Sequence, residues 1–482
     1  MNNSISNNIL WRFAERFLAQ LIAFIVSIIL ARILLPEHYG TVALVNVFIL
    51  FADVFVESGL PSALIQKKDS DNFDFSTVFY FNIGFSIILY VVLFFLAPII
   101  SDYYNNYLLT PVIRVLSIRI FIAAFNSIQQ AYISKNMQFK KFFLATLFGT
   151  IVSAAVGIIL AYNGFGVWAL VFQYLSNILI DTIILFFVIK WKPLLYFSLR
   201  RLKYLLKYGW KILFEGLAAT FYSQIRNLII GKVYTEIDLG YYNRGDQFPG
   251  LIMNNINTSI NSVLFPAMSK VQEDNNQLVT ILRKSIRITS YILFPMLFGM
   301  AAIAFNMVIV LLTDKWIDCV PFIYIACFIQ FITIGMYPRH QALKAIGRSD
   351  IFMIEHMMSR VIGIILLILV YRISVLHIAL TGVVSTIILF IIIVTTSKKY
   401  SNYKIKDQIS DVLVLVLMSL IMFLPTFLFG YFVNINPILE LLIQIIMGIT
   451  IYFILSIILK PEGFVFIIGF IRRLFFCQKE VN

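Results

Sequence analysis

Apolar segments long enough to cross a lipid bilayer fill the sequence from Trp11 to Lys460. A helix needs about 20 mostly apolar residues to cross the hydrocarbon core, and by that length we count roughly fourteen spans. Hydrophobic residues make up 60% of the chain and charged residues only 13%, as expected for a protein whose surface faces lipid. The sequence therefore predicts an all-α polytopic membrane protein with about 14 transmembrane helices.

The loops between the expected spans are short, so little of the chain is expected outside the bilayer. The first six spans are Trp11–Leu35, Gly40–Ile65, Thr77–Ile100, Leu109–Tyr132, Phe142–Tyr162 and Phe165–Lys190. The next six are Tyr208–Val233, Gly240–Met268, Ser285–Thr313, Val320–Leu343, Ile351–Tyr371 and Ser374–Thr396. The last two are Ile409–Val433 and Pro437–Leu459.

Lysine and arginine are distributed unevenly between the loops on the two sides of the membrane. They are concentrated in the loops after the second, fourth, sixth, eighth, tenth and twelfth spans, whereas the loops on the opposite side contain only Lys232, Lys315 and Arg372. Because basic loops stay in the cytoplasm, this bias predicts that both termini are cytoplasmic and that the number of spans is even. A nucleic-acid-binding protein would instead gather its basic residues on one surface, so we exclude that class.

Motifs of enzymes and metal sites do not occur in the sequence. It contains no P-loop, no His-Glu-x-x-His and no Gly-x-Ser-x-Gly. Its three cysteines are too dispersed for a disulfide framework, and His38, His340, His356 and His377 are far apart along the chain. The protein is therefore expected to be no enzyme and to use neither a metal nor a cofactor.

The sequence shows weak internal duplication at a common offset of 200 positions. The aligned pairs are Glu15 with Glu215, Arg32 with Lys232, Gly40 with Gly240 and Phe48 with Phe248. Six spans in each repeat give both repeats the same orientation, as in transporters that rock one bundle against the other. We expect one six-helix bundle at residues 1–200, a second at 201–400, and an accessory transmembrane pair with a cytoplasmic tail at 401–482.

Ionisable residues inside a membrane are costly and usually face a bundle interior or an aqueous cavity. The deepest ones in the expected spans are Asp53, Glu57, Arg119, Asp181, Arg226 and Arg360. Asp53 and Glu57 are four residues apart and therefore share one helical face. Two carboxylates on one face either pair with arginines of neighbouring helices, which fixes packing, or bind a coupling cation.

Arginine is the residue best suited to hold a phosphate inside a membrane protein. Its guanidinium stays charged and grips phosphate oxygens through two parallel hydrogen bonds. The residues predicted to bind a lipid pyrophosphate are Arg119, Arg226 and Arg360. The residues predicted to balance charge or to carry a coupling proton are Asp53, Glu57 and Glu215.

Several short motifs resemble those of bacterial polysaccharide flippases. The most specific block runs from Leu239-Gly240-Tyr241-Tyr242-Asn243-Arg244 to Val263-Leu264-Phe265-Pro266-Ala267-Met268. The others are Leu35-Pro36-Glu37-His38-Tyr39-Gly40, Asp314-Lys315-Trp316 and Ala345-Ile346-Gly347-Arg348-Ser349-Asp350. The chain is similar, over almost its whole length, to the Wzx-type O-antigen, capsule and colanic-acid exporters of the multidrug/oligosaccharidyl-lipid/polysaccharide superfamily.

This resemblance implies two six-helix bundles around a central cationic cavity. It also implies that the protein moves undecaprenyl-pyrophosphate-linked oligosaccharide across the bacterial cytoplasmic (inner) membrane, coupled to an ion gradient, for O-antigen, lipopolysaccharide or exopolysaccharide biosynthesis. In similar lipid II flippases the two extra helices form a groove for the lipid tail, a role the resemblance implies for the last two spans. A polysaccharide polymerase and a chain-length regulator are the implied partners, and a monomer is expected.

Three other functions compete with this one. A drug/cation antiporter of the same superfamily shares the twelve-helix core, but an acid-dominated cavity without deep arginines would be expected of it. A polymerase or ligase typically carries a large periplasmic loop, whereas every loop expected on the periplasmic side of this protein is short. A scaffold would gain nothing from buried charges that are costly in lipid.

Overall fold

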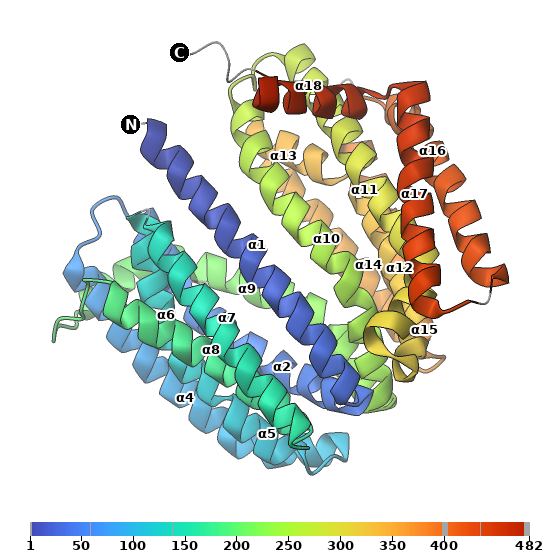
Figure 1. The fold of residues 1–482 in the computed structure, drawn as a ribbon. Helices are drawn as coiled ribbons and strands as arrows, with labels where there is room; N and C mark the ends of the chain where they lie inside the picture. The colour runs from blue at the N-terminus through green and yellow to red at the C-terminus, as the bar shows by residue number, and fades with distance from the viewer. Residues whose placement is uncertain (1, 58, 137, 398–402, 434, 477–482) are drawn as a thin grey trace. The chain divides into compact units, whose positions relative to one another are not determined.

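The computed structural model describes residues 2–57, 59–136, 138–397, 403–433 and 435–476, and helices account for most of them (Figure 1). No strand occurs in these ranges, so the expected all-α fold is confirmed. Packing divides the chain into two compact units, Met1–Gly240 and Tyr241–Asn482. The expected repeat boundaries near residues 200 and 400 concern internal symmetry rather than packing, and they stay a prediction.

The first unit consists of antiparallel helices joined by short turns. Its helices are α1 (Asn2–Ile33), α2 (Pro36–Glu57), α3 (Gly59–Gln66), α4 (Asn72–Tyr104), α5 (Leu109–Leu116), α6 (Ile118–Lys135), α7 (Phe139–Tyr162), α8 (Val167–Val188) and α9 (Leu199–Val233), and α10 (Glu236–Ser269) begins in it. Helix α7 packs along α8 and α1, and α2 packs against both α6 and α9.

The second unit is organised around the long helix α11. Its elements after α10 are α11 (Asn275–Leu312), the 3-10 helix η1 (Asp314–Cys319), α12 (Val320–Thr333), α13 (Tyr337–Ala345), α14 (Ser349–Val370), α15 (Val375–Ser397), α16 (Ile405–Phe432), α17 (Pro437–Leu459) and α18 (Glu462–Phe476). Helix α11 packs against α12, α16, α17 and α18. Figure 1 shows α16 and α17 side by side and α18 lying across the end of this unit.

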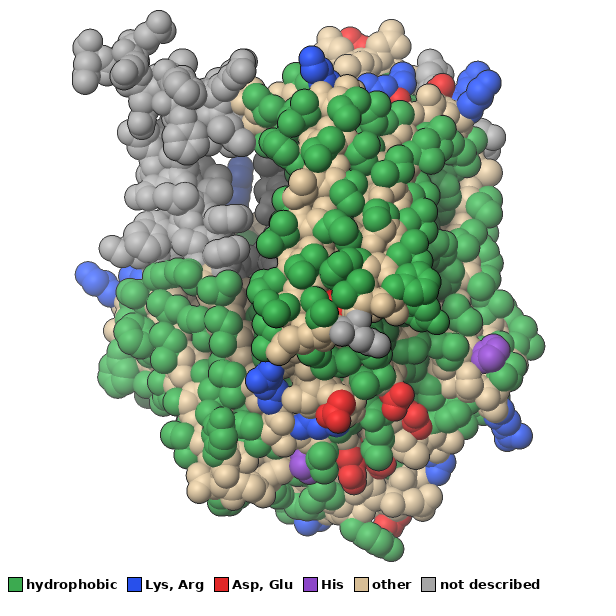
Figure 2. All heavy atoms as spheres, turned by 45° about the vertical axis from the view of Figure 1, so that its right-hand side comes forward, with side chains coloured by type: hydrophobic (Ala, Val, Ile, Leu, Met, Phe, Trp, Pro, Cys, Tyr) green, Lys and Arg blue, Asp and Glu red, His purple; other side chains and the backbone are tan. Residues whose placement is uncertain are grey.

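Eleven helical segments among the described residues are long and apolar enough to cross a membrane. Each coincides with an expected span. The expected spans not among them correspond to α1, described as apolar only over Leu18–Ile33, and to the more polar α9 and α10. Hydrophobic side chains cover most of the described surface on the face in Figure 2, as lipid contact requires.

Two expected spans are interrupted within the described residues. Helices α5 and α6 meet at Ser117. The span predicted at Val320–Leu343 is divided into α12 and α13, with Pro338 in the first turn of α13. Gly335 and Pro338 explain the break between α12 and α13, and broken helices in transporters commonly border binding sites.

The loops of the first unit that are rich in lysine and arginine meet at one end of this unit. Arg201 Nη1 lies 2.7 Å from Asp71 Oδ1 and 2.9 Å from Asp74 Oδ1. Lys67 Nζ lies 2.5 Å from Asp74 Oδ2, and Lys135 Nζ donates to the Lys67 carbonyl at 2.7 Å. The loops that follow the second, fourth and sixth expected spans therefore lie together at one end of this unit.

A pH dependence follows from Asp71, the N-cap residue of α4. Burial raises the pKa of its carboxyl, but the Asp74 N–H and the Arg201 guanidinium outweigh burial and hold the pKa below its ordinary value. The ionised carboxylate therefore stabilises the fold above about pH 3.9 and loses this effect as the pH falls further. We expect Asp71→Asn, which preserves the cap, to cost about 0.5 kcal/mol at neutral pH and nothing near about pH 3. Thermal unfolding of the detergent-solubilised protein at both pH values measures this; an equal difference at both would exclude the charge as its cause.

The opposite end of the first unit is closed by backbone contacts between helix starts. Gly40 lies on the first turns of α2, and a Cβ added there would overlap the carbonyl of Glu236 at the start of α10. The contact is reciprocal, because a Cβ on Gly240 would overlap the carbonyl of Pro36. Two residues aligned by the 200-residue offset thus make equivalent contacts, each of which only glycine permits.

In the second unit, the buried carboxylate of Asp411 links α16 to α11. Asp411 of α16 accepts hydrogen bonds from Arg283 at 2.8 and 2.7 Å, from Arg287, and from the Tyr403 hydroxyl at 2.9 Å. Arg287 also bonds Glu462 of α18 at 2.9 Å. The Asp411 side chain is only 2% exposed, so α11 and α16 meet at one desolvated charge. Helix α18 is joined to them through the pair of Glu462 with Arg287.

Candidate functional site

The central feature of the first unit is an ion pair between α2 and α6. Arg119 Nη2 lies 3.2 Å from Asp53 Oδ2, and the two side chains are 25% and 7% exposed. Neither Asp53 oxygen accepts a hydrogen bond from the residues that the structure describes. The buried Asp53 carboxylate is therefore held near Arg119 by charge rather than by a formed hydrogen bond.

Helix α6 carries a polar face that extends away from Arg119. The Asn126 amide donates to Asp181 Oδ2 of α8 at 2.7 Å and to the Thr182 hydroxyl at 2.9 Å, and Gln130 donates to Asn126 at 2.5 Å. Residues 119, 126 and 130 are spaced by seven and four positions, which places them on one helical face. The interruption at Ser117 lets α6 begin inside the unit, next to Arg119.

Glu57 and Glu215, which were predicted together with Asp53 to balance charge or carry a coupling proton, lie in more open positions. Glu57 is the last residue of α2, one turn beyond Asp53, and its side chain is exposed. Glu215 lies on α9 and is also exposed. Only Asp53 of these three is therefore buried against an arginine.

Arg226 and Arg360, the other predicted arginines, belong to different units. Arg226 lies on α9, half-buried, with its guanidinium 5.5 Å from the centre of the Tyr222 ring. Helix α9 packs against α2, and the Gly59 and Gly209 backbones touch, since a Cβ on either would lie 2.9 Å from the other's carbonyl oxygen. Arg360 is half-buried on α14, one turn from His356.

Sequence reasoning missed a fully buried arginine in the second unit. Arg339 is 1% exposed and donates to Gln408 at 2.8 Å, to Ser397 at 2.8 Å and to the Tyr403 carbonyl at 3.4 Å. It ties α13 to the end of α15 and the start of α16. Its burial was not expected because Arg339 follows Pro338 near the end of a predicted span, where an exposed position is the simpler expectation.

Sequence reasoning also missed the proximity of two histidines. The rings of His340 on α13 and His356 on α14 have centroids 4.9 Å apart, although 16 positions separate them in the sequence. Glu355 lies beside them, with its Oε2 atom 3.7 Å from His340 Nε2. No group of three or more metal-binding side chains is formed by the described residues.

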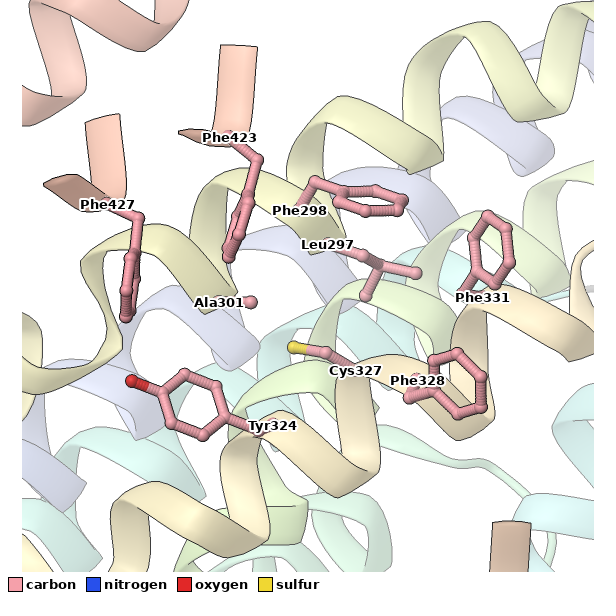
Figure 3. A pocket seen from close by; sticks show the side chains of 9 residues that line it. All are labelled: Leu297, Phe298, Ala301, Tyr324, Cys327, Phe328, Phe331, Phe423 and Phe427. Atoms are coloured by element: carbon pink, nitrogen blue, oxygen red, sulfur yellow. The ribbon is translucent and has the colours of Figure 1, made fainter. Parts of the chain in front are cut away.

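The second unit also contains two apolar cavities beside the last helices. One, of about 350 Å³, is lined by aromatic side chains of α11, α12 and α16, among them Phe298, Phe331 and Phe423 (Figure 3). The other, of about 550 Å³, lies among α10, α11, α16 and α17 and is lined by Met296, Met422 and other apolar residues. Both can accept a hydrocarbon chain, and neither offers a charged group.

Comparison with known proteins defines the class to which this fold and these sites belong. Residues 29–321 match the polysaccharide biosynthesis protein family, and the chain belongs to that family. Its curated relatives include proteins of lipopolysaccharide and teichuronic acid biosynthesis, one of them named WzxC, so the predicted resemblance to the Wzx-type polysaccharide family is confirmed.

Two curated relatives are individually informative. The lipopolysaccharide biosynthesis protein WzxC of Escherichia coli K12 is 25% identical over 325 residues, which cover 67% of this chain and 66% of that protein. The teichuronic acid biosynthesis protein TuaB of Bacillus subtilis is 25% identical over 307 residues, 63% of each chain. This chain thus matches these relatives over about two thirds of their own lengths.

Solved structures show the same fold. A lipid II flippase, MurJ, in an inward closed conformation superposes with a TM-score of 0.78 over 94% of this chain and 98% of that chain, at 18% identity. An inward-facing multidrug-resistance transporter gives a TM-score of 0.59 over 79% of this chain and 95% of that chain, at 16% identity. Of these two, the likeness extends further for the lipid II flippase, because it includes nearly the whole chain.

Proposed function

We propose that the protein moves undecaprenyl-pyrophosphate-linked oligosaccharide repeat units from the cytoplasmic to the periplasmic leaflet of the bacterial cytoplasmic membrane. The observation that carries the proposal is the Asp53–Arg119 contact at the start of the polar face of α6. A sugar-pyrophosphate head group enters a membrane interior only where protein groups replace its water. The amides and carboxylate of this face offer such groups over about three helical turns.

The arginines are the groups proposed to bind the pyrophosphate. Arg119 reaches α2 from α6, and Arg226 lies on α9, which packs against the same helix. Asp53 balances the charge of Arg119 while no substrate is bound, and Glu57 on α2 and Glu215 on α9 add further negative charge to these two helices. Arg360 lies in the second unit, and we retain it as a separate phosphate-binding candidate.

The proposed architecture is two six-helix bundles, at residues 1–200 and 201–400, and an accessory pair at 401–482. This requires α1, α9 and α10 to cross the membrane beside the eleven apolar segments, which gives fourteen spans. The convergence of the basic loops at one end of the first unit supports a cytoplasmic location for that end. The charge bias of the loops along the whole sequence is the reason for proposing that both termini are cytoplasmic.

The accessory pair is proposed to hold the polyprenyl tail. The cavity among α10, α11, α16 and α17 is apolar and is bordered by the pair itself. A tail in this cavity would stay in a hydrocarbon environment while the head group moves, so only the polar part of the lipid would have to be solvated by protein.

The proposed activity is ion-coupled alternating access, a transport cycle rather than catalysis, and it uses no cofactor. A monomer contains all of the helices and cavities that this cycle needs. A polysaccharide polymerase and a chain-length regulator would act on the translocated lipid.

A drug/cation antiporter is the second candidate, and the superposition on a multidrug-resistance transporter favours it. That superposition omits about a fifth of this chain, whereas the superposition on a lipid II flippase covers 94% of it. An antiporter would also have less use for an arginine paired with a buried aspartate at the start of a polar helix face.

A leaflet assay on the purified protein in liposomes tests the proposed function. Fluorescent undecaprenyl-pyrophosphate oligosaccharide is loaded, and its accessibility to an external quencher is followed with and without an ion gradient. We expect protein-dependent transfer that a gradient accelerates. Absence of transfer for several glycans, together with uptake of a soluble cationic dye, would establish the antiporter instead.

A further inference from the structure

A buried cluster of titratable side chains lies between α13 and α14, outside the pyrophosphate site proposed above. His340 is 6% exposed and Glu355 is 1% exposed, and the His356 ring packs within 4.9 Å of the His340 ring, centroid to centroid. The Phe352 ring covers both imidazoles, at centroid distances of 4.9 Å and 4.4 Å. The cluster is therefore sealed on one side by an aromatic ring.

The hydrogen bonds of this cluster are incomplete. Thr396 of α15 donates to Glu355 Oε1, but Glu355 Oε2, His340 Nε2 and His356 Nε2 are buried without a partner among the described residues. Each such atom has lost its water without gaining a hydrogen bond, which is unfavourable. The His340 Nε2 and Glu355 Oε2 atoms are 3.7 Å apart, too far for a hydrogen bond but within reach of one after a small shift.

We propose that His340 and Glu355, with His356 beside them, form a proton-binding site that couples transport to a proton gradient. One proton held between His340 Nε2 and Glu355 Oε2 satisfies both orphaned atoms at once, because one atom then donates and the other accepts. Histidine and glutamate at a buried position are typical of proton relays in transporters. This inference rests on the proposed function, of which it identifies the coupling ion.

The charged groups around the cluster are compatible with a single exchangeable proton. Lys344 of α13 stands 4.2 Å from the centre of the Phe352 ring, and Arg360 is the cationic neighbour of His356 on α14. Arg339 and Tyr403 also lie near α13, but Arg339 bonds to Gln408 and the Tyr403 hydroxyl bonds to Asp411. From α11, Leu278, Leu282 and Ile286 belong to the same apolar cluster as Ala342 and Ala345 of α13.

A hard cation such as sodium fits this site poorly. Hard cations are bound by several oxygen ligands, as calcium and magnesium are. The cluster offers the oxygens of Glu355 and Thr396, and its other polar atoms are imidazole nitrogens. A proton needs only one donor and one acceptor, which the pair already supplies.

The position of His340 connects proton binding to a movable element. Helix α13 is short and is bounded by a break at each end, with Gly335 before it and Gly347, at φ +77°, after it. A hydrogen bond formed between His340 and Glu355 draws α13 toward α14. The same short helix carries Arg339, which anchors α15 and α16, so a shift of α13 reaches both.

Two measurements test this site, and the first needs no transport. Infrared difference spectra of the purified wild-type protein between about pH 8 and about pH 5 report carboxyl protonation. We expect a carboxyl band that disappears in Glu355→Gln, shifts in His340→Gln, and is unchanged in His377→Gln, whose histidine is exposed and bonded to Ser374. Bands unchanged by Glu355→Gln in the folded variant would overturn the proposal.

The second measurement is the leaflet assay with an imposed proton gradient. We expect Glu355→Gln and His340→Gln to lose the gradient stimulation while retaining gradient-independent transfer, and His377→Gln to behave as wild type. Stimulation that persists in Glu355→Gln, or stimulation by sodium alone, would overturn the proton site and leave the flippase function intact. Absence of transfer by the wild type would instead refute the proposed function, and the infrared bands would still decide the proton site.

Discussion

We expect Arg119→Ala to lower glycan export by roughly tenfold to a hundredfold. The loss of charged hydrogen bonds to a phosphate costs about 1.5–3 kcal/mol, and tenfold corresponds to about 1.4 kcal/mol. The substitution also leaves the carboxylate of Asp53, 7% exposed, without its cation. A lower amount of folded protein is therefore expected from this single variant, by up to about 3 kcal/mol of stability.

A double variant separates binding from packing. Asp53→Asn combined with Arg119→Ala removes the orphaned charge, so the amount of folded protein should return toward that of the wild type. If Arg119 binds the pyrophosphate, export should stay low in the double variant. Export restored together with protein level would show that the pair serves only to hold α2 against α6. Export in an export-deficient strain and the membrane-extracted protein level are measured side by side, with Asp53→Asn as the control.

A third variant, Arg119→Lys, tests the geometry of the contact. This substitution keeps the positive charge but not the two parallel donors of the guanidinium. We expect partial export if charge alone matters and poor export if the phosphate is held through two hydrogen bonds.

Gly40→Ala is expected to destabilise the first unit severely. The new methyl group would overlap the backbone carbonyl of Glu236, and backbone cannot rotate away as a side chain can. Overpacking typically costs about 1–3 kcal/mol, and a backbone obstacle places this variant at the upper end. Gly240→Ala should behave alike, because its methyl group would meet the Pro36 carbonyl.

Gly84→Ala is the matched control for these two variants. Gly84 lies within α4, and a Cβ added there would have no atom within 4 Å. Alanine favours a helix over glycine by about 0.5–1 kcal/mol, so this variant should be neutral or slightly stabilised. Thermal unfolding in detergent compares the three. Equal melting temperatures for Gly40→Ala and Gly84→Ala would show that the α2–α10 contact is not formed.

The helical fold could be predicted from sequence because lipid imposes a strong and simple rule. Runs of about 20 apolar residues fix the positions of helices, and every expected span from Thr77–Ile100 to Pro437–Leu459 lies on helix in the structure. The interruption at Ser117 was not predicted, since a one-residue break does not alter the hydropathy of a window.

The candidate sites could be predicted only in part. Asp53 and Arg119 were selected by depth, and the structure brings them together. The pairing itself could not be derived, because Asp53 and Arg119 are 66 positions apart and the sequence of neither helix indicates which other helix it packs against. His340 and Glu355 were missed for the same reason, since a break and a turn separate two helices whose proximity only packing reveals.

Asp411 has a consequence for how such proteins can change in evolution. Arg283 and Arg287 of α11 both pair with this carboxylate, which is contributed by the accessory pair, and Arg287 also pairs with Glu462 of α18. A descendant that lost the last two spans would retain two arginines without their counter-charge at the membrane surface. Loss of the pair and replacement of both arginines are therefore expected to occur together in a lineage, and a gene truncated after α15 should yield little inserted protein.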